Sequence, residues 1–510
     1  MNKITTFLRT NPLYLVLLPV FFVLHGYLEN FGFVSLRDAA ILCLTYILLT
    51  ISINLFSYIF FRNWTKAAVI TVVWMSFFFF FGAVHEFLKS HPVLEVFGHY
   101  RFLLPAIFAV LIAIFIYLKK IKKPFLRSTL FLNVLFTIYI VVDLGAVLIK
   151  AIRPPEHQLT VYNFARENQY KTCDTCARPN IYFLLMDEYG SSLSLKEQYE
   201  FDNSSFDSFL VKNGFQIQTK SKSNYNFTAF SMSATLNMSY IEGIKNVKAV
   251  TADDYATCGV LVRNNEVIKF LDAHGYEIVN YSVFDLAGNP AMVEQSFLPL
   301  KTKLITDRTL FSRMNKDIGW LLMTYYPFKL FKRNYILKHR DNNHMFQELV
   351  MKAAIEKKPR PRFIYAHFYM PHPPYYYDRN GKLADNATLY KEYKSDPLYT
   401  YLEYLQYVNE RIKEMVTAIR TNDPGAIVIL LSDHGYRNGS RPSKDYNAEP
   451  ECYFQNLNAV YFPDGDYRGL YDSITNVNMF RVILNKTFNQ NFPLIPDSTI
   501  FLRDSKPAPP

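Results

Sequence analysis

Hydrophobic residues dominate five stretches within the first 150 residues, with polar residues between them. The stretches cover roughly 12–28, 39–61, 67–88, 102–118 and 128–149. Each is close to the ~20 residues that an α-helix needs to cross the hydrocarbon core of a bilayer. We therefore predict a transmembrane domain of five helices over residues 1–150.

The charges between these stretches predict their orientation. If the N-terminus is cytoplasmic, the cytoplasmic segments contain nine Lys and Arg residues and the two outer loops contain three. Positive charge favours the cytoplasmic side, so the N-terminus is expected inside and every residue after 150 outside. The first stretch has no small-residue cleavage site and further stretches follow it, which indicates an anchor and not a removable signal peptide.

Several polar residues lie near the outer ends of the stretches. They are His25, Glu29, His85, Glu86, His99 and, within the fifth stretch, Asp143. Side chains at a membrane interface commonly extend toward water; the alternative is that they form the floor of a site shared with the outer domain. No stretch has the broken, paired pattern of a transporter core, so we interpret the bundle as an anchor that can also deliver lipid.

The pattern changes beyond residue 180, where short apolar runs alternate with helical patterns. The apolar runs are 181–186, 277–283, 363–369, 426–431 and 459–462, and the clearest helical patterns are 404–419 and 476–484. Such alternation is typical of an α/β domain with a largely parallel sheet. We predict this outer domain over 180–510, joined to the membrane domain by a polar linker over 151–179.

The composition agrees with a membrane part joined to a soluble part. Of all residues, 50% are hydrophobic and 19% are charged, which excludes a disordered protein and a collagen-like fibre. Residues 1–150 contain 13 Lys and Arg against 5 Asp and Glu, and the other 360 residues contain 42 against 39. The excess positive charge therefore lies in the membrane part, and nucleic-acid binding is not supported.

The chain has five cysteines. Cys173 and Cys176 form a C-x-x-C in the linker, where an oxidising compartment favours a short-loop disulfide. No βαβ pattern surrounds them, as a redox protein would require, and a zinc site would need two further ligands. A structural bridge is the favoured interpretation. Cys43 lies in a span, and pairing between Cys258 and Cys452 stays open.

Acidic residues and histidines follow three of the predicted strands. Asp187 and Glu188 follow the first, His372 follows the run 363–369, and Asp433 and His434 follow the run 426–431. Ligands of open α/β sheets bind outside the carboxyl ends of the strands, and this set of side chains suits zinc or manganese. Each residue alone could equally serve a turn or a cap, but three strand ends together favour a metal site.

A phosphoryl- or sulfuryl-transfer site also needs a nucleophile. Residues 224–240 become helical in pattern from Thr228 onward. A hydroxyl at a helix N-terminus lies near backbone N–H groups that suit a phosphate, and coordination to a metal would lower its pKa. Thr228 could equally be an N-cap residue, and the sequence pattern does not separate the two roles.

These motifs resemble the alkaline phosphatase/sulfatase superfamily. The TAFS sequence starting at Thr228 and the Asp433-His434-Gly435 sequence carry most of the resemblance, and His372 in HPP is a looser match. Five spans before an outer catalytic domain make the chain more closely similar to the membrane-anchored branch, which contains phosphoethanolamine transferases and lipoteichoic acid synthases. The resemblance covers nearly the whole chain and implies an alkaline-phosphatase-like fold.

The resemblance also implies one divalent metal, zinc or manganese. In this family the metal is held by residues matching Asp187, Thr228, Asp433 and His434, and Thr228 is the nucleophile. Phosphoethanolamine transferases use a further His after the Asp-His pair for a second zinc, and no His follows His434 here. The site therefore resembles the single-metal synthase type. Basic residues stand in the same region, namely Arg437, Arg441 and Lys444.

Other residues are expected to have supporting roles. His372 and Arg437 would stabilise the phosphate oxygens, and Glu188 is a candidate substrate contact or additional ligand. Asn226 is a candidate phosphate donor, although Asn in loops usually serves turn chemistry. His367 either joins the site or faces the core. The C/S-x-P-S-R motif of true sulfatases does not occur around the nucleophile, which disfavours a sulfatase.

The implied reaction transfers phosphoethanolamine or phosphoglycerol from a membrane phospholipid to a glycan or lipid hydroxyl through a phosphorylated Thr228. The protein is then expected in a bacterial inner (plasma) membrane, with its catalytic domain periplasmic or extracellular. Release of the same intermediate to water would instead give a phosphodiesterase, a phosphatase or a sulfatase-like hydrolase. A metal-free scaffold is disfavoured because all four metal-site residues are present, and a transporter would need flux that is independent of the outer domain.

Overall fold

The structure is a computed structural model of the whole chain. It describes residues 3–122, 124–153, 159–161, 170–171, 173, 175–293, 302–317, 337–385, 388–389, 398–437 and 451–504. The chain divides into two compact units. The membrane unit comprises Met1–Glu156, Pro299–Tyr326 and Ala508–Pro510, and the outer unit comprises His157–Leu298 and Pro327–Pro507.

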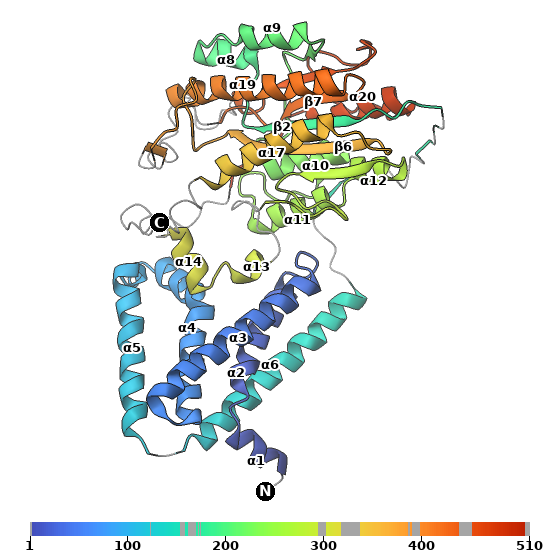
Figure 1. Cartoon of the computed structure of the whole chain (residues 1–510). Coiled ribbons are helices and arrows are strands. Elements are labelled where there is room, and N and C mark those ends of the chain that lie inside the picture. The colour runs from blue at the N-terminus through green and yellow to red at the C-terminus, as the bar shows by residue number, and fades with distance from the viewer. Residues whose placement is uncertain are drawn as a thin grey trace. The chain divides into compact units, whose positions relative to one another are not determined.

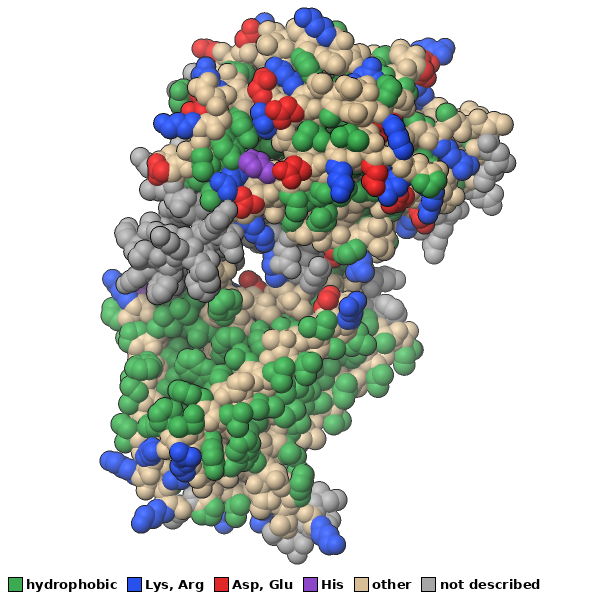
Figure 2. Space-filling view, viewed as in Figure 1, with side chains coloured by type: hydrophobic (Ala, Val, Ile, Leu, Met, Phe, Trp, Pro, Cys, Tyr) green, Lys and Arg blue, Asp and Glu red, His purple; other side chains and the backbone are tan. Residues whose placement is uncertain are grey.

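The membrane unit is a bundle of apolar helices (Figure 1). Its helices are α1 (Lys3–Thr10), α2 (Tyr14–Glu29), α3 (Leu36–Phe61), α4 (Trp64–Ser90), α5 (Tyr100–Lys120) and α6 (Leu126–Ile152). Within the described residues, α3 to α6 are long and apolar enough to cross a membrane, and α2 is a shorter apolar helix. The five predicted stretches therefore all form helices. Figure 2 shows that hydrophobic side chains cover much of the visible surface of this unit.

Aromatic packing and one buried asparagine hold these helices together. Phe22 of α2 stacks on Phe79 of α4 with ring centroids 4.3 Å apart, and Tyr46 of α3 contacts both rings. The Asn133 side chain of α6 accepts from the backbone N–H of Tyr14 at 2.8 Å and donates to two carbonyls that precede α2. These bonds satisfy an N–H group at the start of α2 and carbonyl groups at the end of α1 and in the turn after it, which have no partner within a helix.

A six-stranded sheet forms the centre of the outer unit. Its strands are β2 (Ile181–Asp187), β3 (Gln216–Ile217), β5 (Glu277–Tyr281), β6 (Arg362–Pro371), β7 (Ile427–Ser432) and β8 (Asn458–Tyr461). They lie in the order β3-β8-β7-β2-β6-β5, with β7, β2, β6 and β5 parallel and β8 and β3 antiparallel to their neighbours. The predicted largely parallel α/β sheet is confirmed.

Helices enclose this sheet and bury its central strands. They include α10 (Thr228–Asn237), α11 (Ala252–Arg263), α17 (Lys338–Ile355), α19 (Leu398–Asn422) and α20 (Asn476–Phe488). Helices α17 and α19 pack against β6, and α10 packs against α11 and α20. In Figure 1, α19 and α11 lie on opposite sides of the sheet. All residues of β2, β6 and β7 are buried, as is typical of parallel strands with both faces covered.

Two features could not be anticipated from the sequence pattern. Residues 302–317, which the pattern placed inside the outer domain, group with the membrane unit because helices α13 (Lys303–Thr306) and α14 (Leu310–Asp317) contact α2 and α4. In the linker, β1 (Thr160–Val161) pairs with β4 (Ile241–Glu242) of the outer unit.

The cysteines follow the favoured interpretation. Cys173 and Cys176 form a disulfide. Cys43, Cys258 and Cys452 are not in disulfides, so the open question of a Cys258–Cys452 pair is answered in the negative.

The central position of β2 gives a stability prediction. Leu184 is fully buried between β6 and β7. We expect Leu184→Ala to lower the unfolding free energy of the outer unit by about 2–5 kcal/mol, because it leaves a cavity that packed strands cannot fill. Urea unfolding of the full chain in detergent, followed by the signal of the outer unit, measures this loss. The control Leu383→Ala, at a residue that is 43% exposed, should change little, and equal effects of both variants would contradict the prediction.

Candidate metal centre and nucleophile

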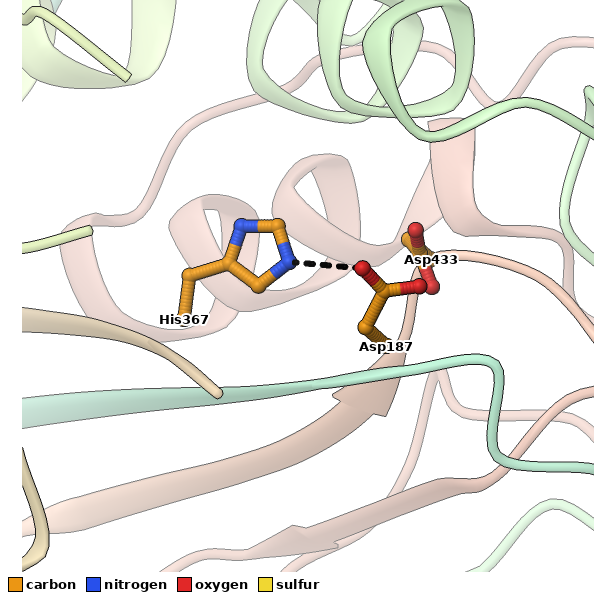
Figure 3. Close-up of side chains that lie close together, drawn as sticks. All are labelled: Asp187, His367 and Asp433. Carbon is orange, nitrogen blue, oxygen red and sulfur yellow. Dashed lines mark ion pairs between the residues drawn. The ribbon is translucent and has the colours of Figure 1, made fainter. Parts of the chain in front are cut away.

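Three adjacent strands bring ionisable side chains to one place. Asp187 is the last residue of β2, Asp433 directly follows β7, and His367 lies in β6. Each of these buried residues offers a ligand atom, and the three atoms lie within 4.8 Å of one another. In Figure 3 the His367 imidazole points toward Asp187, and Asp433 lies close to the same carboxylate. The carboxyl ends of parallel neighbours thus form a candidate metal centre.

His434 adds a second imidazole to this cluster. Its Nε2 atom lies 3.4 Å from Asp433 Oδ2 and 3.8 Å from Asp187 Oδ1. Its Nδ1 atom lies 2.8 Å from the Gly435 carbonyl oxygen, to which an N–H at Nδ1 would donate. The Nε2 lone pair then faces the carboxylates, in the tautomer that a metal ligand requires.

Several buried polar atoms in the cluster have no hydrogen-bond partner among the described residues. They are both carboxylate oxygens of Asp187, Oδ2 of Asp433 and Nε2 of His367. A buried carboxylate without a partner is costly, and a divalent cation among these atoms would satisfy all of them. Carboxylate oxygens together with imidazole nitrogens suit zinc or manganese, so the residues present fit a divalent metal, and the number of ions stays a prediction.

Burial and mutual repulsion dominate the electrostatics of the cluster. Burial and the neighbouring charge of Asp433 raise the pKa of Asp187 well above its usual value, and burial raises the pKa of Asp433. Burial lowers the pKa of His434 to about 3 and that of His367 to about 4. Both imidazoles are therefore neutral near pH 7, as metal ligands must be, and the carboxylates favour any nearby positive charge.

The structure places the Thr228 hydroxyl beside this cluster. Thr228 Oγ1 lies 3.5 Å from His434 Nε2, and the Thr228 hydroxyl helps to lower the otherwise raised pKa of Asp433. Thr228 is the first residue of α10, where the N-cap position is Phe227 and no side chain caps the helix. The hydroxyl is therefore not used as a cap, which removes the alternative that the sequence pattern left open.

A second group contains the remaining charged residues. The Arg437 backbone N–H donates to Glu188 Oε1 at 3.0 Å, and its Nε donates to the same oxygen at 3.3 Å. His372 Nε2 lies 3.7 Å from Glu188 Oε2 and 3.4 Å from Arg437 Nη2. Burial alone would raise the pKa of Glu188, but the charges of Arg437 and His372 outweigh it and lower that pKa. Glu188 thus fixes the Arg437 guanidinium, and the His372 imidazole, whose own pKa burial lowers, lies beside both.

Asn226 lies at the edge of this group with its side chain engaged elsewhere. Its Nδ2 donates to the Leu502 carbonyl at 3.0 Å, and its Oδ1 accepts from the Leu502 N–H at 2.8 Å. The Asn226 backbone carbonyl accepts from Arg437 at 3.4 Å. The amide group predicted as a phosphate donor is thus occupied, because it fixes the C-terminal segment. Arg441 and Lys444 lie outside the described residues.

His367 is the residue whose place the sequence left undecided. It is paired in register with Leu185, two residues before Asp187 on β2. Side chains two apart on a strand share a face, so His367 and Asp187 lie on one side of the sheet. The register between β6 and β2, which are distant in the sequence, shows that His367 and Asp187 share a face. The alternation of residues within β6 alone does not show this.

Comparisons with known proteins agree with this architecture. Residues 262–490 match the family model of the sulfatases. This match contains His367, His372, Asp433 and the residues that follow them, and Asp187 lies before it. The expected resemblance to the alkaline phosphatase/sulfatase superfamily is confirmed, and the outer unit contains a sulfatase-like α/β domain. No curated protein matches the sequence.

Solved structures of similar fold include periplasmic domains of phosphoethanolamine transferases. The C-terminal periplasmic domain of EptC from Escherichia coli is 12% identical, with 66% of this chain and 93% of that chain covered and a TM-score of 0.39. The corresponding EptC domain from Campylobacter jejuni is 14% identical, with 62% and 92% covered and a TM-score of 0.35. The soluble domain of lipooligosaccharide phosphoethanolamine transferase A from Neisseria meningitidis is 13% identical, with 61% and 89% covered and a TM-score of 0.36.

The unpaired carboxylates predict a stabilising metal. We expect zinc or manganese at about 100 times its Kd to stabilise the full chain by about 2.7 kcal/mol, and Asp187→Asn to abolish this effect. Without metal, the same variant should be at least as stable as the wild type, because it removes an uncompensated buried charge. Thermal unfolding with and without metal measures both effects. The control Asp253→Asn, at an exposed carboxylate of α11, should respond to metal like the wild type, and a full metal response of Asp187→Asn would refute the site.

The position of His367 predicts a separate effect on metal binding. We expect His367→Gln to weaken metal affinity by about 10–100-fold, the range for a group that orients or supplements the ligands. Titration of the metal-free full chain with zinc, read against a competing chelator, gives the affinity. The matched control is His274→Gln, since His274 is also buried but bonds to the Phe270 carbonyl. An unchanged affinity in His367→Gln would assign His367 to the core alone.

Proposed function

We propose that this protein transfers a phosphorylated headgroup, phosphoethanolamine or phosphoglycerol, from a membrane phospholipid to a hydroxyl of a glycan or lipid. The observation that carries this proposal is the position of Thr228. Its hydroxyl lies 3.5 Å from His434 Nε2, beside the buried carboxylate and imidazole atoms that have no hydrogen-bond partner among the described residues. A hydroxyl beside a metal and at a helix N-terminus is an activated nucleophile.

The roles of the residues follow from their positions. Asp187, Asp433, His434 and Thr228 would hold the divalent metal, with His367 adjoining them. When bound, the metal supplies a positive charge that lowers the pKa of a nearby hydroxyl and stabilises phosphate oxygens. We assign to Arg437 and His372 the binding of the non-bridging phosphate oxygens, because Glu188 fixes both beside the cluster.

The reaction is then two displacements at phosphorus. In the first, the bond between Thr228 Oγ1 and phosphorus forms, the bond from phosphorus to the diacylglycerol oxygen breaks, and the Thr228 proton ends on that oxygen. In the second, the acceptor oxygen bonds to phosphorus, the bond to Thr228 breaks, and the acceptor proton returns to Thr228. The helix N-terminus at Thr228 offers backbone N–H groups to the phosphate in both steps.

The apolar helices favour a lipid donor. An enzyme acting on a soluble phosphate ester would not require a membrane unit. An enzyme acting on a bilayer lipid gains from such a unit, because it keeps the protein at the membrane that contains the lipid phosphate. We propose that the protein lies in a bacterial inner membrane with its N-terminus cytoplasmic and its outer unit periplasmic or extracellular. Figure 2 supports this orientation, because Lys and Arg side chains gather at the end of the bundle where the N-terminus lies.

Hydrolysis is the second candidate function. The same phosphorylated Thr228 could be released to water, since both reactions need the same nucleophile and metal. Thr228 is only 7% exposed. This burial favours transfer, because restricted access of water would protect the phosphorylated Thr228 from hydrolysis.

The first experiment follows the intermediate on Thr228. We expect intact-protein mass spectrometry of the full chain, incubated with zinc or manganese and either phosphatidylethanolamine or phosphatidylglycerol, to detect an added headgroup phosphate. Thr228→Ala should lose the adduct and reduce diacylglycerol release by at least ~10³-fold. The matched control Thr235→Ala lies in the same helix, where its hydroxyl bonds to the Ser231 carbonyl, and should keep both.

The outcomes separate the candidate functions. A headgroup adduct that passes to an added glycan or lipid acceptor would support transfer. Diacylglycerol release that is rapid, needs Thr228 and shows no acceptor dependence would favour hydrolysis. Neither an adduct nor diacylglycerol with any of these lipids and metals would contradict the lipid donor.

A further inference from the structure

One segment of the chain belongs to the outer unit by sequence and to the membrane unit by contact. In the sequence it lies between two described parts of the outer unit, residues 175–293 and 337–385. Between these parts, residues 302–317 form α13 and α14, which lie against the membrane helices in Figure 1. We call residues 302–317 the membrane-docked segment.

The segment fits into two places where a membrane helix has a glycine. A Cβ atom at Gly26 of α2 would lie 2.6 Å from Ile305, and a Cβ at Gly82 of α4 would lie 2.6 Å from the Arg308 carbonyl oxygen. The Ile305 side chain is buried in the apolar core of the bundle. Because the contact at Gly82 is with backbone, no side-chain rotation could make room for a larger residue there.

A backbone hydrogen bond fixes the register of this contact. The Gly82 N–H donates to the Arg308 carbonyl at 2.7 Å, outside its own helix. It follows a break in α4, where Phe80 departs from helical geometry with φ −104° and ψ 15°. A helix in an apolar environment gives up an internal bond only where another partner replaces it. The segment is that partner.

The charges beside this contact are not balanced. Glu86 of α4 pairs with Arg313 and lies 3.8 Å from Arg308 Nε. The Arg313 side chain is 14% exposed and the Arg308 side chain 65% exposed. Two guanidinium groups therefore share the Glu86 carboxylate, and Arg308 is the more exposed and more distant of the two. Phe311 in the same segment is 72% exposed.

We propose that the membrane-docked segment binds the phosphate group of a membrane phospholipid through Arg308, with Phe311 against the apolar part of that lipid. A phosphodiester carries the negative charge that the pair of guanidinium groups lacks, and Arg is suited to bidentate phosphate contact. An exposed aromatic ring next to an Arg is typical of side chains at a membrane interface. The inference rests on the proposed function in naming the lipid as the donor. It adds that a segment lying in sequence between two parts of the outer unit contributes to the binding of that lipid.

The test measures lipid binding without turnover. The full chain carrying Thr228→Ala is purified in detergent and titrated with fluorescent short-chain phosphatidylglycerol, phosphatidylethanolamine or, as a probe without phosphate, diacylglycerol. We expect Arg308→Gln to weaken binding of both phospholipids about tenfold and to leave diacylglycerol binding unchanged. Arg308→Lys should retain part of the affinity, since it keeps the charge and loses the bidentate geometry.

Two further variants control for charge and for docking. Arg37→Gln removes an exposed arginine at the start of α3 and should leave phospholipid binding unchanged. Gly82→Val should displace the segment and weaken phospholipid binding as much as Arg308→Gln does. Thermal unfolding of each variant confirms that the bundle is intact, and Arg308→Gln should pass this check because its side chain is exposed.

Several results would overturn the inference. These are unchanged phospholipid binding in Arg308→Gln, an equal loss in Arg37→Gln, or an equal loss of diacylglycerol binding. The binding assay does not depend on chemistry at Thr228. A protein that binds phospholipid through Arg308 but forms no adduct on Thr228 would therefore contradict the proposed function alone. An adduct that forms normally in Arg308→Gln with unchanged affinity would contradict this inference alone.

Discussion

Two carboxylates held away from water impose the main constraint on the outer unit. Asp187 and Asp433 are 1% and 0% exposed and end neighbouring parallel strands. Burial and repulsion disfavour their charged forms, so the strands must hold them together against an unfavourable interaction of several kcal/mol. The fully buried residues of β2, β6 and β7 supply this rigidity. Holding the two carboxylates together thus lowers the stability of the metal-free fold and makes the site strongly favour a divalent cation.

The proposed nucleophile, Thr228, is tied to the same constraint through its helix. Ser231 Oγ, one turn after Thr228, donates to the Asp433 carbonyl at 2.6 Å, and every residue of α10 is buried. The Thr228 hydroxyl and the Asp433 carboxylate are therefore positioned by one rigid connection, and not by two loops that move separately. Preorganisation of this kind is what allows a hydroxyl to react without a large reorganisation cost.

Local patterns predicted much of this arrangement, and long-range packing supplied the rest. The apolar stretches, the strands ending at Asp187 and Asp433, and the helix starting at Thr228 each depend on residues close in sequence, so periodicity was sufficient to find them. The place of His367 depends on register between β6 and β2, and the membrane-docked segment depends on the glycines of distant helices. The hydrophobic periodicity of neighbouring residues predicts neither the place of His367 nor the docking of this segment. The same is true of Asn226, whose side chain is engaged by Leu502.

The balance of charge at the site bears on how the proposed metal would be held. The described site contains three carboxylates, Asp187, Glu188 and Asp433, and one guanidinium, Arg437, which hydrogen-bonds to Glu188. Arg437 therefore offsets Glu188, whereas both oxygens of Asp187 have no hydrogen-bond partner among the described residues. A divalent cation beside Asp187 and Asp433 would oppose the burial and the repulsion that raise the pKa of Asp187. In the proposed reaction, a fixed guanidinium beside that cation would meet part of the electrostatic demand of a phosphate.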